Sequence, residues 1–171
     1  MKKPFQQGFF DGLCSVYSVC NSYQITNNAS DEETEMLFRE IIIYLQKKRK
    51  LSSTILDGMY ASNLKKLIDE VVKGRFIEVV YNYNWRDYTL DAFWMFSQRY
   101  LSEQNTAMIL SVGGRENHFT TVEKMTDKTM FLVDSSGLKR INKSQIKLQG
   151  YTKKDKYVVY PNQCFYLKGK I

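Results

Sequence analysis

One cysteine and one histidine could form a nucleophile and its base. Cys14 follows the pair Asp11-Gly12 and begins a segment whose apolar residues recur with a helical period. The first turn of a helix carries unpaired backbone N–H groups and partial positive charge, which favour the thiolate, the nucleophilic form of cysteine. His118 is the only histidine and begins a segment rich in β-branched residues. It is therefore the one imidazole that could activate Cys14.

Asp134 is the candidate that could orient this imidazole. It ends the strand-like segment that follows His118, and the turn residues 126–128 separate the two segments. In an antiparallel hairpin the two residues meet at the same end of the sheet, where a carboxylate can fix the imidazole tautomer. An aspartate that opens a turn, here residues 134–137, is also ordinary turn chemistry, so both roles stay open.

Acyl transfer also requires hydrogen-bond donors for the oxyanion that develops on the substrate. The backbone N–H of Cys14 is one candidate donor, and the side-chain amide of Gln7 or Gln6 is the other. Cys20 and Cys164 fit buried apolar positions. An odd cysteine count favours a reducing compartment over a disulfide framework, and a lone histidine argues against zinc, so we expect no metal or cofactor.

The elements that must position these residues form a helical first half and a strand-rich second half. Ser30 and Glu33 match a capping box at the start of one helix, and Gly74 suits the position just past the end of another. Helices are predicted over residues 13–23, 30–48, 60–73 and 90–101, and strands over 76–81, 107–112, 118–124, 130–133, 157–160 and 163–168. Helices followed by an antiparallel sheet predict an α+β fold, with residues 1–171 as a single domain.

Composition and charge limit the function classes. With 43% hydrophobic and 14% aromatic residues the 171-residue chain is not disordered, and no apolar stretch is long enough to span a bilayer. The N-terminus is a poor signal peptide, so we expect a cytoplasmic protein. A net charge of +7 permits nucleic acid or an acidic protein as partner, and the aromatic residues of segment 81–88 could stack on bases. A non-catalytic basic binding module is therefore an alternative to an enzyme.

Taken together, the chain resembles the papain-like cysteine peptidases, most closely their C39-like branch. The resemblance lies in residues 7–18, 117–122 and 131–137, which hold Gln7, Cys14, His118 and Asp134 in the order of the family. It implies a papain-like fold in which the nucleophile begins the first helix and an antiparallel sheet follows. It also implies a peptidase that hydrolyses a peptide or isopeptide bond of a polypeptide substrate, without a cofactor. Deamidation or transglutaminase-type acyl transfer by the same site is the alternative enzyme chemistry.

Overall fold

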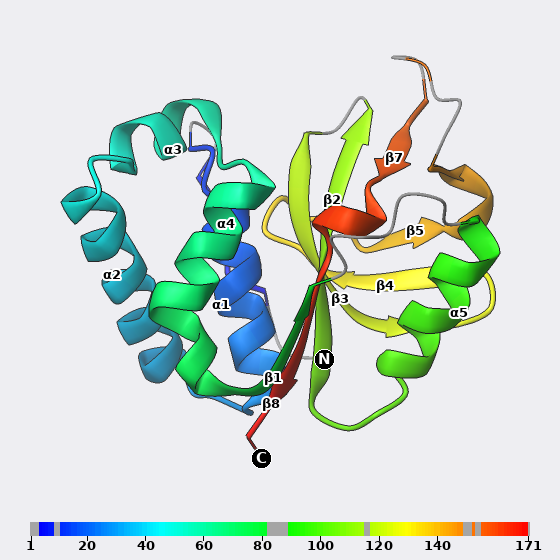
Figure 1. Cartoon of the computed structure of the whole chain (residues 1–171), viewed down its shortest axis with the longest axis horizontal. Helices are drawn as coiled ribbons and strands as arrows, with labels where there is room; N and C mark the ends of the chain where they lie inside the picture. The colour runs from blue at the N-terminus through cyan, green and yellow to red at the C-terminus, as the bar shows by residue number, and fades with distance from the viewer. Residues whose placement is uncertain are drawn as a thin grey trace.

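The computed structural model describes residues 4–8, 11–81, 89–114, 117–148, 152 and 155–170. Within them the fold is α+β, with helices first and a largely antiparallel sheet after them, as the sequence predicts. Four helices gather on one side of the sheet and the fifth lies on the other (Figure 1). Residues 82–88, most of the aromatic segment behind the binding-module alternative, lie outside the described residues.

The helices on the first side belong to the first half of the chain. They are α1 (Cys14–Thr26), α2 (Asp31–Lys47), α3 (Leu51–Asp57) and α4 (Ala61–Leu67), and α5 (Leu90–Tyr100) covers the opposite face. Ser30 and Glu33 form the predicted capping box of α2, with Ser30 Oγ accepting from Glu33 N at 3.1 Å. The helix predicted over 60–73 is present, but only α4 is α-helical, and the chain continues directly into a π-helical turn (Ile68–Val72) and a 3₁₀ turn (Lys73–Arg75).

Eight strands form one sheet. They are β1 (Phe76–Tyr81), β2 (Thr106–Gly114), β3 (His118–Met125), β4 (Thr129–Val133), β5 (Arg140–Asn142), β6 (Ile146–Lys147), β7 (Tyr157–Val159) and β8 (Phe165–Gly169). Their order is β1-β8-β2-β3-β4-β5, and β7 pairs with both β2 and β6. All these pairings are antiparallel except β6 with β7. The sequence reading missed β5 and β6, which are too short for a period-two pattern.

The sheet separates two hydrophobic cores. Along β2 the side chain of Ile109 packs with the core under α1, α2 and α4, whereas its neighbours Met108 and Leu110 pack with the core under α5. This alternation is what the pleat of a strand requires when both faces are covered. Since all three side chains are fully buried, β2 is the rigid centre to which the strands of the candidate site are attached.

Polar contacts fix the position of α1 along the sheet. Thr121 Oγ1 in β3 donates to Ser18 O at 2.9 Å and lies 3.3 Å from Ser22 Oγ, and Asn21 Nδ2 donates to Val133 O in β4 at 3.5 Å. These groups are fully or almost fully buried, so each contact avoids the cost of leaving a polar group unpaired. The register that they set places the first residue of α1 at the end of the sheet where β3 begins.

Among the described residues, no helix combines the length and the apolar character that a membrane span needs.

Candidate active site

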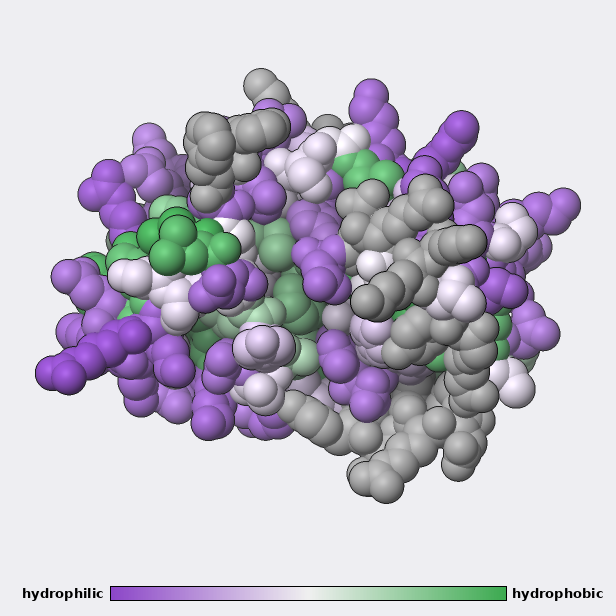
Figure 2. Space-filling model, turned by 90° about the horizontal axis from the view of Figure 1, so that it is seen from above, coloured by the Kyte–Doolittle hydropathy of each residue, from purple (hydrophilic) through white to green (hydrophobic). Residues whose placement is uncertain are grey.

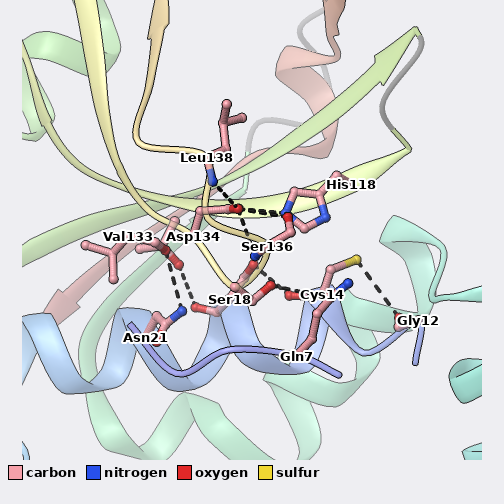
Figure 3. Close-up of polar contacts among 12 residues, drawn as sticks. Gln7, Gly12, Cys14, Ser18, Asn21, His118, Val133, Asp134, Ser136 and Leu138 are labelled. Carbon is pink, nitrogen blue, oxygen red and sulfur yellow. Dashed lines mark hydrogen bonds and ion pairs between the residues drawn. The ribbon is translucent and has the colours of Figure 1, made fainter. Parts of the chain in front are cut away.

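Cys14 is the first residue of α1 and is 8% exposed. The helix begins without a side-chain cap from Leu13, but the carboxylate of Asp11 accepts from Leu13 N at 3.1 Å and from Gly8 N at 2.6 Å. Asp11 thereby ties the preceding segment to the helix start. The thiol lies 4.0 Å from Gly12 O, as drawn in Figure 3. Cys14 therefore sits where the free N–H groups of a helix favour negative charge.

A close backbone contact holds this helix start against the end of α3. Gly12 N donates to Ile55 O at 2.7 Å. A Cβ atom on Gly12 would lie only 2.8 Å from Gly58 N and 2.9 Å from Thr54 O. Because both of these are backbone atoms, a side chain could be accepted only by moving the chain. Glycine is thus required here by close approach, two residues before the candidate nucleophile.

His118 and Asp134 meet at one end of the sheet. His118 begins β3, opposite Val112 of β2, and Asp134 directly follows β4. The antiparallel pairing of β3 with β4 brings His118 Nε2 to 2.6 Å from Asp134 Oδ1 (Figure 3). Asp134 is 2% exposed, so this is a desolvated contact. An ionised carboxylate can only accept, and Nε2 of His118 therefore carries the proton in this bond.

The second carboxylate oxygen of Asp134 is held by the turn that follows it. Oδ2 accepts from Ser136 N at 2.9 Å, from Ser136 Oγ at 2.9 Å and from Leu138 N at 3.0 Å. Ser136 Oγ also lies 3.2 Å from His118 Nε2. Asp134 therefore has both roles that its sequence position permits: it shapes the turn with one oxygen and contacts His118 with the other.

Burial and partners shift the pKa values of this pair in opposite directions. Burial alone would lower the pKa of His118, but hydrogen bonds with Asp134 and Cys14 and the charges of these two side chains raise it to about 10. Burial alone would raise the pKa of Asp134, but hydrogen bonding to His118 and its charge lower it to about 2. At neutral pH the pair is therefore an imidazolium beside a carboxylate, and an adjacent imidazolium favours a thiolate.

Of the two upstream glutamines, Gln7 is the one attached to this site. Gln7 Oε1 accepts from Ser135 Oγ at 3.2 Å, and Gln7 N donates to Ser135 O at 3.2 Å. Ser135 is the buried neighbour of Asp134. Gln6 instead is exposed and lines hollows shared with Asp31 at the start of α2. The bond to Ser135 uses the amide oxygen of Gln7 and leaves its two N–H donors for another acceptor.

A cleft of about 240 Å³ is lined by both Cys14 and His118. It lies between the helical side of the molecule and the sheet, where the face seen in Figure 2 is hollowed. One wall is segment 57–61, between α3 and α4. The opposite wall comes from the sheet, where Ser111 Oγ donates to Gln163 Oε1 at 3.1 Å. The two reactive side chains thus face a space that a ligand could enter.

The two other cysteines lie elsewhere. Cys20 and Cys164 are each 1% exposed, and burial raises the pKa of both thiols to about 12. They fit the apolar positions that the sequence predicts. In the described part of the chain, no group of three or more His, Cys, Asp or Glu side chains could hold a metal ion.

Several residues of the site gave no chemical signal in the sequence. Ser135 and Ser136 read there only as turn residues, and Ser111 and Gln163 only as strand or turn residues. Their contacts with Gln7, with the His118 pair and with each other depend on how distant segments pack.

Neither a scan against protein-family models nor searches of curated proteins and of solved structures found a match for this chain.

Proposed function

We propose that this protein is a cysteine peptidase of the papain-like type, most similar to the C39-like branch, which hydrolyses a peptide or isopeptide bond of a polypeptide substrate. The observation that carries the proposal is that Cys14 and His118 line one cleft while the buried Asp134 holds His118 at 2.6 Å. A thiol at a helix start, an imidazole and an orienting carboxylate are the three parts of an activated nucleophile. The two-sided arrangement, with the cysteine on a helix and the histidine on a strand, also supports the papain-like assignment.

The chemistry proceeds in two steps. The Cys14 thiolate attacks the carbonyl carbon and forms a C–S bond, and His118 donates a proton to the leaving nitrogen as the C–N bond breaks. Water then attacks the thioester, His118 accepts its proton, and the C–S bond breaks to release the carboxylic acid and restore the thiolate–imidazolium pair. The backbone N–H of Cys14 and the side-chain N–H of Gln7 stabilise the oxyanion in each step, while Asp134 keeps His118 in its orientation.

The test is a search for new N-termini. Peptides derived from a whole proteome are incubated with the protein, and the products are identified by mass spectrometry. We expect cleavage that is lost in Cys14→Ala and His118→Ala but kept in Cys20→Ala, a matched control because Cys20 is a buried cysteine of the same helix. Full cleavage by Cys14→Ala would overturn the proposal. Release of ammonia or formation of a cross-linked product, without new N-termini, would replace hydrolysis with deamidation or acyl transfer.

The role of Gln7 has a separate test. Ser135→Ala removes the hydroxyl that holds the amide oxygen of Gln7. Since loss of an oxyanion donor costs about 10²–10³-fold in kcat, a misplaced donor should cost at least about tenfold in kcat with little change in KM. Ser135→Thr, which keeps the hydroxyl, should restore most of the rate. An unchanged kcat in both Ser135→Ala and Gln7→Ala would remove Gln7 from the mechanism and leave the nucleophile assignment intact.

A further inference from the structure

A second groove adjoins the cleft on the helical side. It has a volume of about 640 Å³, and residues 57–60 line both hollows. The two hollows therefore share this segment of their lining. Tyr60 within it is 80% exposed. Figure 2 shows an apolar cluster on this side of the molecule, beside the hollow.

The far part of the groove is basic. Lys48, Lys50 and Lys66 line it. Lys48 Nζ is paired with Glu70 at 2.8 Å. For Lys50 and Lys66, both exposed, no carboxylate of the described residues lies within ion-pair distance. Two cations in this groove are therefore available to an acidic ligand.

The near part of the groove has the opposite charge. Asp57 is exposed, lines both hollows, and ends α3, where the helix dipole already disfavours a carboxylate. A negative group next to the cleft would be repelled by Asp57. The segment that the groove shares with the cleft thus brings a carboxylate and the exposed Tyr60, and the lysines line only the groove.

We propose that this groove binds an acidic segment of the polypeptide substrate, a few residues away from the bond that is cleaved. The substrate has a non-acidic residue beside Asp57, an apolar residue against Tyr60, and carboxylates at Lys50 and Lys66. Discrete carboxylates fit this charge pattern better than a nucleic acid does, because a continuous phosphate backbone would pass Asp57 as well as the lysines. The inference rests on the proposed peptidase function, since it concerns the substrate of the same site.

Binding can be measured without turnover, in a Cys14→Ala background. The probes are two fluorescent alanine-based peptides, each with one leucine, which carry either three glutamates or three glutamines. At low salt we expect the glutamate peptide to bind about tenfold more tightly, and this preference should vanish near 0.5 M salt, where exposed charges are screened. Lys50→Glu combined with Lys66→Glu should abolish the preference. The matched control is Lys124→Glu with Lys128→Glu, which makes the same charge change at the far end of β3.

Three outcomes would overturn the inference. They are equal binding of the two peptides, an equal loss of preference in the control variant, and tighter binding of an oligothymidylate that depends on Lys50 and Lys66. The last result would make the groove a nucleic-acid site. Because the binding assay needs no catalysis, a failure of the peptidase proposal leaves its result readable. Conversely, cleavage of proteome peptides without any preference for acidic residues would overturn the groove and leave the peptidase proposal standing.

Discussion

Replacing Asp134 with Asn should disable Cys14 by reversing the hydrogen-bonding roles around His118. The oxygen Oδ2 of Asp134 accepts two backbone N–H bonds, from Ser136 and Leu138, while Oδ1 accepts from His118. Asparagine has one acceptor oxygen and one NH₂ group that only donates. If its oxygen faced His118, the NH₂ would meet the two backbone donors and leave them unpaired, at a cost of about 1–3 kcal/mol each.

The opposite orientation of the asparagine amide is therefore lower in free energy. The asparagine oxygen keeps the backbone bonds, its NH₂ faces His118 Nε2, and the ring must accept there. The ring proton then moves to Nδ1, so this nitrogen can no longer accept the proton of the Cys14 thiol. A wrong tautomer of this kind lowers kcat by about 10⁴-fold in serine proteases, and we expect a loss of similar size here.

Alkylation of Cys14 by limiting iodoacetamide measures this effect without a substrate. The raised pKa of His118, about 10, keeps the imidazolium in place at neutral pH, so the alkylation rate in the wild type should rise much less between pH 6 and 8 than that of a free thiol. In Asp134→Asn the rate should follow a free thiol with a pKa of about 8.5 and rise roughly 75-fold over the same range. Cys20 and Cys164, both buried, serve as internal unreactive controls in the mass spectra.

Asp127→Asn, a change at an exposed aspartate of the β3–β4 turn, is the matched control and should behave as the wild type. The reasoning would be refuted by a flat profile in a folded Asp134→Asn protein. A steep profile at Cys14 of the wild type would refute it as well, since no thiolate–imidazolium pair would then exist in the resting protein.

Three further predictions concern stability. Gly12→Ala forces a Cβ atom to within 2.8 Å of a backbone atom and should lower the free energy of unfolding, measured by urea titration, by about 1–3 kcal/mol. Gly74→Ala, with open space around the new methyl group, should be neutral. Equal effects of the two substitutions would contradict the close-approach argument. The Asp134–His118 pair should contribute fully to the free energy of unfolding between about pH 4 and 6.5. This contribution should be lost as the pH falls through about 2, where Asp134 is protonated, or rises through about 10, where His118 is deprotonated. If the pair were not formed, the difference in unfolding free energy between wild type and Asp134→Asn, measured by urea titration across pH, would show no such plateau. Leu37→Ala, at a fully buried position of α2, should cost about 2–5 kcal/mol in the same assay, and a cost under 1 kcal/mol would contradict the core assignment.

The sequence predicted the elements with strong local signals. The capping box at Ser30 located the start of α2, and the turn residues between β3 and β4 placed His118 and Asp134 at one end of a hairpin before any geometry was known. Local sequence patterns did not predict the elements whose presence or geometry depends on tertiary packing. Helix α3 has seven residues and no side-chain cap, and the helix after it changes to π geometry at Ile68 although its sequence pattern continues.

The finer parts of the site depend on contacts between distant segments. Ser135 and Gln7 are separated by 128 positions along the chain, so their bond has no local signature. The choice between Gln6 and Gln7 depends on which of two adjacent side chains faces the turn after β4, and spacing alone left it open. Periodicity likewise predicts the buried stripe of α1 but not its polar contacts with β3, which set where Cys14 lies.

The strand order has a consequence for when the candidate site can assemble during synthesis. Cys14 is made early, whereas β8, the last of the described strands along the chain, lies in the interior of the sheet between β1 and β2. A nascent chain that already contains Cys14 but not β8 therefore lacks an inner strand that pairs with β2, the strand to which β3 is attached. The ribosome releases this inner strand only after everything else in the sheet, so the nucleophile and its base are joined late. Incomplete or clipped chains that lack β8 should accordingly leave the thiol of Cys14 unactivated, so the proposed activity would require β8 to be in place.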